Sequence, residues 1–294
     1  MTSRWAIALH GGAGVTPGRD YRPVEAHLGE LVLAAEARLA EGASALDTVE
    51  WAVAELEASG LYTAGRGSPP NRAGEVEFDA SIMDGPTRRA GAVAAIQDVL
   101  SPIAAARAVM ERTPHVLLAG AGATAFAREI GLPAIGNDRD YFRLAIGVEP
   151  EDLDVPADAL GHGTVGAVAL DREGRLAAAT STGGIYGKRP GRVGDTPLPG
   201  AGTWADELCA ISCTGVGEHF IRAGGAGDVA AQLRYGDIPL GTAAETMLQR
   251  VKSFGGNGGL IALDHTGSEI FAWNSSGLKR AAYGSHIRRM VAID

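Results

Sequence analysis

HGTVGAVALDREGRLAAATSTGG, residues 162–184, is a β-hairpin pattern with a threonine near each end. Apolar runs flank the turn residues 171–174, which predicts a strand, a tight turn and a second strand. The same pattern returns in GGLIALDHTGSEIFAWN at 258–274, where residues 264–267 form the turn. Because hairpins pair their strands antiparallel, these two segments favour an antiparallel or mixed sheet over a doubly wound parallel one.

Further strands and helices are predicted on both sides of the first hairpin, from apolar periodicity and from the glycines and prolines that end each run. The predicted strands lie at 4–10, 75–85, 88–98, 115–119 and 207–213, and the predicted helices at 22–41, 45–59, 102–112, 123–131, 217–223, 226–233 and 240–252. Strands and helices come in separate runs, which predicts sheets covered by helices. The acidic, proline-bearing stretch 136–160 has the composition of a linker. Nothing marks a domain boundary, so we predict one domain over residues 1–294.

Composition excludes several classes of function. The chain has 294 residues, of which 46% are hydrophobic, enough for a sizeable core. A net charge of −9 and the absence of a Lys/Arg run argue against binding to nucleic acid. The chain contains no run of 18 apolar residues, which a membrane-spanning helix would need. The segment MTSRWAIALHGGAG lacks an export pattern, so we expect a cytoplasmic protein. Cys209 and Cys213 are expected to be buried free thiols, because their spacing suits neither a redox pair nor a zinc site.

Two glycine motifs could carry chemistry of their own. HGGAG at 10–14 resembles the oxyanion loop of α/β-hydrolases, but that fold needs a GxSxG elbow, which the chain lacks. Residues 120–125 fit the dinucleotide fingerprint GxGxxA, and Asp140 lies about 20 residues further on. A tight strand-to-helix turn is the simpler interpretation, and a dinucleotide-dependent enzyme stays as an alternative. The seven histidines show no ligand spacing such as HExxH, so no catalytic metal is predicted.

Thr164 is the strongest candidate for covalent chemistry. A threonine hydroxyl is a weak nucleophile unless a base lies beside it, and the residue's own α-amine, with a pKa of about 7.7–8.0, is a suitable base. That amine is free only after a cut immediately before the threonine. Gly163 precedes it, and its missing Cβ is expected to permit a strained backbone at the cut. Because threonine is common in strands, these residues alone leave an ordinary structural role open.

Ordered motifs along most of the chain favour the chemical role. The first hairpin continues into KRPGRVGDTPLPGAG and SCTGVGEHFIRA, and the other motifs are HGGAG, LYTAGRGS, FDASIMDG, RTPHVLLAGAGATAFA and GGNGGLIALD. In these motifs the chain resembles the isoaspartyl peptidase and plant-type L-asparaginase family of N-terminal nucleophile hydrolases. The resemblance implies a four-layer αββα fold of the α+β class. It also implies self-cleavage between Gly163 and Thr164, into an α subunit of residues 1–163 and a β subunit of residues 164–294.

The same resemblance assigns the reacting groups. Thr164 matches the nucleophile that attacks the side-chain carbonyl of the substrate and forms an acyl-enzyme. Thr182 matches the residue that orients this nucleophile, and Thr214 with Gly215 matches the oxyanion hole. Two glycines of the HGGAG motif, Gly11 and Gly12, are expected to pack near the cut.

The substrate implied by the resemblance is a β-aspartyl dipeptide or, less well used, L-asparagine. Arg192 and Asp195 match the pair that holds its α-carboxylate and α-ammonium, and Gly217 matches a backbone contact to the amine. A guanidinium fork suits a carboxylate and a carboxylate suits an ammonium, so the assignment is chemically sensible. The mature form is expected to be a dimer of αβ pairs.

No cofactor is implied for catalysis, but the stretch LEASGLYTAGR resembles the family's sodium-binding loop. Carbonyl ligands leave little trace in a sequence, so this assignment rests on the resemblance alone. The residues that would contribute ligands are Leu56, Glu57, Ser59, Tyr62, Ala64 and Arg66.

Two segments depart from the family pattern. Thr63 stands where the family usually has asparagine, and WNSSGL at 273–278 replaces an FNTxGM stretch. The change at Thr63 is expected to alter hydrogen bonding in the active site. It also leaves open that the chain is an uncleaved relative that serves only as a binding or structural protein.

Overall fold

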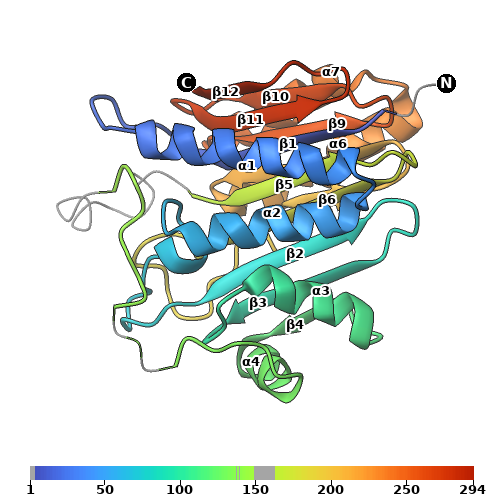
Figure 1. Cartoon of the computed structure of the whole chain (residues 1–294). Coiled ribbons are helices and arrows are strands. Elements are labelled where there is room, and N and C mark those ends of the chain that lie inside the picture. The colour runs from blue at the N-terminus through green and yellow to red at the C-terminus, as the bar shows by residue number, and fades with distance from the viewer. Residues whose placement is uncertain (1–3, 137, 139, 149–162) are drawn as a thin grey trace.

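Two β-sheets lie face to face, and helices cover the outer face of each (Figure 1). The computed structural model describes residues 4–136, 138, 140–148 and 163–294. One apolar core lies between the sheets, and a further core lies between each sheet and its helices. This arrangement is the four-layer αββα fold that the resemblance implies.

The larger sheet has eight strands in the order β12-β11-β1-β5-β6-β2-β3-β4. Their bounds are Met290–Ile293 for β12, Leu278–Gly284 for β11, Ala6–Ala13 for β1, Val165–Leu170 for β5, Leu176–Thr182 for β6, Phe78–Asp84 for β2, Ala90–Ile96 for β3 and Leu117–Ala119 for β4. All neighbours are antiparallel except β3 and β4. Strand β1, which precedes Thr164 in the sequence, lies between β11 and β5, which follow it.

The smaller sheet has four strands in the order β10-β9-β8-β7. Their bounds are Glu269–Trp273 for β10, Gly258–Asp264 for β9, Cys209–Gly215 for β8 and Thr203–Ala205 for β7. The turn between β9 and β10 closes with a hydrogen bond from the Gly267 N–H to the Asp264 carbonyl at 2.9 Å. The turn between β5 and β6 closes likewise from Gly174 to Asp171 at 3.0 Å, so both predicted hairpins are confirmed.

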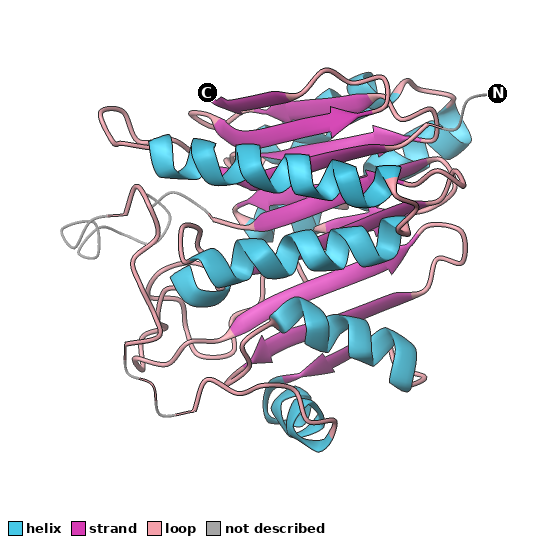
Figure 2. Cartoon of the chain, viewed as in Figure 1, coloured by secondary structure: helices cyan, strands magenta, loops and turns pink. Residues whose placement is uncertain are grey.

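Helices cover both outer faces, and Figure 2 shows them on the two sides of the stacked strands. The helices with the larger sheet are α1 (Arg22–Ala40), α2 (Ala45–Ser59), α3 (Pro102–Arg112) and α4 (Gly120–Glu129), and those with the smaller sheet are α5 (Gly217–Ala223), α6 (Gly225–Gly236) and α7 (Leu240–Ser253). A short 3₁₀ turn, η1 (Gly65–Gly67), follows α2. Local chemistry explains the bounds of α2, because Ser44 caps its N-terminus through the Asp47 N–H and Gly60 ends it in the left-handed conformation.

Three strands, β7, β11 and β12, are not evident in the sequence pattern. Strand β11 contains Lys279 and Arg280, which interrupt its apolar run although both side chains are buried. Lys279 donates to the Gly14 carbonyl at 2.7 Å, and Arg280 pairs with the Asp294 carboxylate at 2.7 Å. These partners come from distant segments, so the strand depends on tertiary contacts that a local pattern does not reveal.

Part of the predicted linker is packed against the protein. The Arg143 N–H donates to the Arg66 carbonyl and the Ile146 N–H to the Leu61 carbonyl, both at 3.0 Å, and Ala145 is buried. The linker prediction is therefore wrong for residues 140–148, because backbone hydrogen bonds and apolar side chains anchor this segment. Residues 149–160 of the predicted linker lie outside the described residues.

The glycine motif at 120–125 forms a strand-to-helix turn. It starts α4 directly after β4, a three-residue strand at the edge of the sheet, and among the described residues no further strand completes a dinucleotide crevice there. Cys209 and Cys213 are buried and free, as predicted. Within the part of the chain that the structure describes, no helix is long and apolar enough to cross a membrane.

Candidate active site

The two threonines of the first hairpin lie close together at one end of it. Thr164 immediately precedes β5 and Thr182 ends β6, and the register pairs Val165 with Ser181. The Thr182 hydroxyl donates to the Gly163 carbonyl at 2.7 Å. Thr164 and Thr182 are only 5% and 4% exposed. The carbonyl that joins Gly163 to Thr164 is thus polarised by a hydroxyl, which makes its carbon a better target for a nucleophile.

Gly163 is required by close packing. A Cβ atom at this position would lie 1.1 Å from the Thr63 hydroxyl oxygen, so only glycine fits here. Close packing thus gives a reason for this glycine besides the predicted strained backbone, which stays a prediction. The Thr63 carbonyl also accepts the Gly183 N–H at 2.9 Å. Thr63, where the chain departs from the family pattern, consequently lies directly against the predicted cut.

One small cavity, of about 10 Å³, gathers most of the residues to which the resemblance assigns chemistry. Its walls come from the end of the β5–β6 hairpin, the loop after β6, the end of β8 and the start of α5. The lining residues are Gly163, Thr164, Thr182, Gly184, Ile185, Arg192, Gly194, Asp195, Thr196, Gly215 and Gly217. Thr214 precedes Gly215 in β8 and is buried, but it is not among these lining residues.

Asp195 presents an unpaired carboxylate oxygen in this cavity. The residue is buried, and among the described residues its Oδ2 atom has no hydrogen-bond partner. Burial raises the pKa of this carboxyl to about 7. A Cβ at Gly217 would lie 2.9 Å from Asp195 Oδ1, so α5 begins tightly against the carboxylate. Because an unpaired buried carboxylate is costly, this position is suited to a cationic ligand.

Arg192 is oriented by a residue that the sequence analysis does not identify. Glu218 accepts from Arg192 Nε at 2.8 Å and from Nη2 at 2.7 Å. Within the described part of the chain, Arg192 Nη1 has no hydrogen-bond partner, so one edge of the fork can receive a carboxylate. Glu218 looks in the sequence like an ordinary acidic residue in the first turn of a helix. Its pairing with Arg192 depends on the fold.

The HGGAG segment supports Thr214 and the strand that Thr164 precedes. The Ala13 N–H donates to Thr214 Oγ1 at 3.0 Å, which leaves the hydroxyl hydrogen free to bind a different acceptor. A Cβ at Gly11 would lie 2.4 Å from the Tyr62 ring, so a side chain there would displace the ring. Gly12 has φ 103°, a conformation that glycine tolerates. Both glycines lie in β1, which pairs with β5.

The histidine of this segment is a buried, neutral group. Burial lowers the pKa of His10 to about 3, although contact with the Thr164 backbone opposes the shift. His10 Nε2 lies 2.8 Å from Ser212 Oγ, which in turn lies 2.7 Å from Thr180 Oγ1. A chain of hydroxyls therefore links β1, β8 and β6 between the two sheets, directly behind Thr164.

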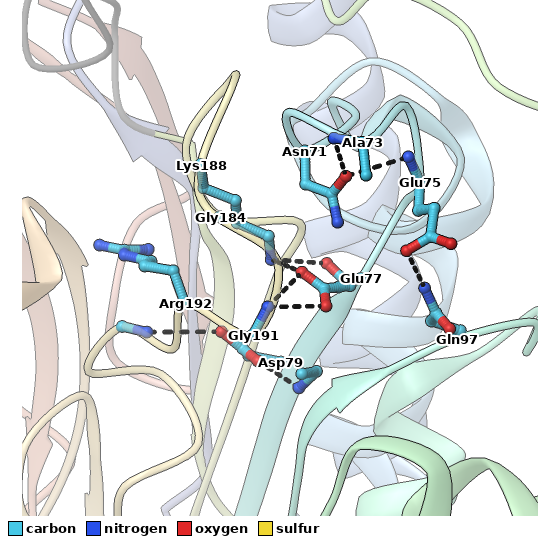
Figure 3. Close-up of polar contacts among 12 residues, drawn as sticks. Asn71, Ala73, Glu75, Glu77, Asp79, Gln97, Gly184, Lys188, Gly191 and Arg192 are labelled. Carbon is cyan, nitrogen blue, oxygen red and sulfur yellow. Dashed lines mark hydrogen bonds and ion pairs between the residues drawn. The ribbon is translucent and has the colours of Figure 1, made fainter.

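A buried charged network fastens the loop that carries Arg192 to the larger sheet (Figure 3). Lys188 Nζ donates to the Glu77 backbone carbonyl at 2.9 Å and lies 3.9 Å from the Glu77 carboxylate. That carboxylate also accepts the Gly191 N–H at 2.9 Å. Burial raises the pKa of Asp79, and the charges of Lys188 and Arg192 oppose this shift. The position of the loop thus depends on buried charges that compensate one another.

Glu77→Ala is expected to lower the free energy of unfolding by about 2 kcal/mol, because it removes the buried acceptor of the Gly191 N–H and one of the two anions, with Asp79, that face the Lys188 ammonium. Glu75→Ala is the matched control: Glu75 is exposed, and its loss should cost less than about 0.5 kcal/mol. Thermal unfolding of both variants measures the difference. Equal melting temperatures in the two variants would contradict the importance of the network.

The six residues of the predicted sodium loop run from the end of α2 into η1 and are Leu56, Glu57, Ser59, Tyr62, Ala64 and Arg66. The Tyr62 carbonyl accepts the Ala64 N–H at 2.8 Å, and each such carbonyl keeps a second lone pair. A Cβ at Gly67 would lie 2.0 Å from the Tyr62 carbonyl oxygen and 3.1 Å from that of Gly60, so carbonyl groups converge on this glycine. A group of carbonyl oxygens with no side chain between them is the kind of donor set that binds a hard cation.

Side chains do not add a further metal site to this loop. The Glu57 carboxylate accepts from Ser101 Oγ at 2.7 Å and from the Ile103 N–H at 2.9 Å, so it is engaged within the protein, and the carbonyl is the atom that Glu57 could offer to an ion. Among the residues described, no group of three or more His, Cys, Asp or Glu side chains could hold a metal ion.

Comparison with known proteins identifies the family. A family model described as Asparaginase matches residues 3–293. The chain belongs to the asparaginase family. It is 44% identical over 297 residues to the isoaspartyl peptidase of Salmonella typhimurium LT2, with 94% of each chain covered. It is also 44% identical over 294 residues to the isoaspartyl peptidase of Escherichia coli K12, covering 94% of this chain and 91% of that protein.

A human relative has a broader name. The isoaspartyl peptidase/L-asparaginase of Homo sapiens is 42% identical over 292 residues, which cover 94% of this chain and 92% of the human protein. Membership of this asparaginase family makes the chain a hydrolase and confirms the resemblance drawn from the motifs.

Proposed function

We propose that this member of the asparaginase family cuts its own backbone before Thr164 and then hydrolyses the side-chain amide of β-aspartyl dipeptides and of L-asparagine. The observation that carries the proposal is one cavity in which Thr164 and Thr182 face Arg192 and Asp195. The names of the relatives, isoaspartyl peptidase and L-asparaginase, support the choice of substrates.

Self-cleavage starts with attack of Thr164 Oγ1 on the Gly163 carbonyl carbon. The C–O bond forms as the C–N bond to Thr164 breaks, so the peptide becomes an ester and the α-amine takes the proton. Water then hydrolyses the ester, which frees the Gly163 carboxylate and restores the threonine hydroxyl. The hydrogen bond from Thr182 to the Gly163 carbonyl stabilises the negative charge that develops on that oxygen.

Substrate hydrolysis uses the freed amine of Thr164 as the base. Asp195 binds the α-ammonium and Arg192 the α-carboxylate, which places the side-chain carbonyl of the substrate near Thr164 Oγ1. Oγ1 attacks this carbon and passes its proton to the amine. The amine then protonates the departing nitrogen, and water hydrolyses the acyl-enzyme.

The oxyanion of both tetrahedral intermediates is assigned to Thr214 and Gly215. The Thr214 hydroxyl accepts the Ala13 N–H, so its own hydrogen can be donated to a developing alkoxide. A Cβ at Gly215 would lie 2.5 Å from the Asn257 carbonyl oxygen, which fixes the backbone next to the cavity.

The proposal is tested by assaying purified protein for release of aspartate from a β-aspartyl dipeptide and of ammonia from L-asparagine. An α-aspartyl dipeptide is the control and should not be hydrolysed. Its scissile carbonyl lies directly on the α-carbon, which is the part of the substrate that Arg192 and Asp195 hold, and not at the end of the side chain. An unsplit protein that hydrolyses neither substrate would support the alternative, an uncleaved relative with a binding or structural role.

Acidic pH is expected to weaken substrate capture through Asp195. The raised pKa of about 7 means that Asp195 becomes neutral as the pH falls below that value and no longer attracts the substrate ammonium. Below about pH 7, protonation of Asp195 should therefore add about a tenfold fall in kcat/KM per pH unit to the fall caused by protonation of the Thr164 amine. Asp195→Asn should lower kcat/KM, and the kcat/KM of this variant should fall less steeply than that of the wild type as the pH is lowered. A variant profile parallel to the wild-type profile would contradict the assignment.

Sodium is proposed as a structural ligand of the carbonyl loop at 56–66. When bound, the ion would neutralise converging carbonyl dipoles and hold Thr63 against the cut, without taking part in the chemistry. Replacing choline chloride by sodium chloride at equal ionic strength should raise the melting temperature by roughly a few degrees. Equal melting temperatures in the two salts would contradict a sodium site. The proposed mature state is a cytoplasmic dimer of αβ pairs.

A further inference from the structure

A second cavity of about 200 Å³ adjoins the proposed catalytic cavity. Gly184 lines both, and Thr63, which lines the second, packs against Gly163 of the first. The walls are mostly apolar and are contributed by Pro69, Pro70, Phe142, Leu144, Ala145 and Tyr186. Such a volume and lining suit a small organic side chain.

The walls of this second cavity are held in place. Arg143 and Ile146 donate backbone hydrogen bonds to the loop before Pro69, and the Phe142 ring packs 6.2 Å from the Phe78 ring of β2. The Gly187 N–H donates to the Pro70 carbonyl at 3.1 Å, which ties the loop after β6 to the opposite wall. Contacts within the fold therefore fix the backbone of the walls of this cavity.

Polar groups lie at both ends of the second cavity. At the inner end, the Thr63 hydroxyl oxygen is buried and has no hydrogen-bond partner among the described residues. At the rim, Arg143 is exposed, and none of the carboxylates in the described ranges forms an ion pair with it. An apolar space between an unsatisfied hydroxyl and a cationic rim matches an amino-acid residue with a free carboxylate.

The proposed chemistry leaves one direction for such a residue. Arg192 and Asp195 bind the aspartyl end of the substrate, and Thr214 with Gly215 faces its carbonyl oxygen. The leaving nitrogen must therefore occupy the side on which Gly163 lies before the cut. That side leads past Thr63 into the second cavity.

We propose that this second cavity binds the leaving residue of β-aspartyl dipeptides and selects large apolar residues. The inference rests on the proposed function. The side chain of the leaving residue packs against Phe142, Leu144 and Tyr186, while Arg143 binds its carboxylate. L-Asparagine, whose leaving group is ammonia, gains nothing from this cavity. Wild-type kcat/KM should consequently be at least about tenfold higher for β-aspartyl-leucine than for β-aspartyl-glycine.

Leu144→Asp tests the apolar wall, because Leu144 is 44% exposed and its substitution should not disturb folding. The variant is expected to lower kcat/KM for β-aspartyl-leucine by about tenfold or more and to leave that for L-asparagine within about twofold. Leu33→Asp, at a leucine of 39% exposure in α1, is the matched control and should change neither value.

Arg143→Ala tests the cationic rim. It should lower kcat/KM for β-aspartyl-leucine by about tenfold but have little effect on β-aspartyl-leucine amide, which lacks the carboxylate. Equal losses on every substrate, or no preference for leucine over glycine in the wild type, would overturn the assignment of the cavity while leaving the hydrolase proposal intact. Failure of the split protein to hydrolyse any of these substrates would overturn both.

Discussion

Thr164→Ala is expected to leave the protein as a single chain of 30.2 kDa, whereas the wild type separates on a denaturing gel into residues 1–163 and 164–294. Alanine lacks the hydroxyl that attacks the Gly163 carbonyl, so the ester cannot form. Without the cut, the α-amine stays within a peptide bond and cannot act as a base. Loss of nucleophile and base together should reduce amidase activity by more than about 10⁴-fold.

Thr164→Ser is the matched control for this experiment. Serine keeps the hydroxyl and, after the cut, the α-amine, so the protein should still split, at a rate that intact mass spectrometry can follow. An alanine variant that splits at the same position would remove Thr164 from the proposed mechanism. An alanine variant that remains whole and fully active would retain the hydrolase but exclude the N-terminal nucleophile.

Arg192→Ala is expected to raise KM for β-aspartyl dipeptides by about 100-fold or more, because truncating one partner of a charge-assisted pair typically costs 2–5 kcal/mol. The loss should appear mainly in KM, since Arg192 binds a part of the substrate that does not react. Arg192→Lys should recover only part of the affinity, because an ammonium keeps the charge but not the planar fork.

Arg189→Ala is the control in the same loop. Arg189 is exposed and does not line the cavity, so its removal changes the net charge equally without removing the proposed contact. Michaelis constants for one β-aspartyl dipeptide compare the three variants with the wild type. A KM for Arg192→Ala equal to that of Arg189→Ala would show that Arg192 does not bind the substrate.

Local sequence signals predict much of the fold. The helices at 45–59, 102–112 and 217–223 have their predicted bounds, because caps, prolines and glycines next to them determine where each helix starts and ends. Strands β7, β11 and β12 are not predicted. The first and last are short, and β11 contains charged residues whose partners come from elsewhere in the chain.

The candidate site, like the fold, is predicted from the sequence only in part. Motif resemblance predicts Thr164, Arg192 and Asp195, and the structure places all three around one cavity. It does not predict Glu218, which orients Arg192, or the contact between Thr63 and Gly163. Each of these contacts joins segments far apart in the sequence, so only the three-dimensional arrangement reveals them.

The strand order of the larger sheet would hold the two products of the proposed cut together. Strand β1 hydrogen-bonds on both sides to strands that follow Thr164, and β2 pairs with β6, which also follows it. Cleavage of one peptide bond would therefore produce two polypeptides whose strands alternate in one sheet and which share one hydrophobic core. The two polypeptides could exchange with those of another molecule only by unfolding. Each molecule would therefore retain the two polypeptides that were synthesised as one chain.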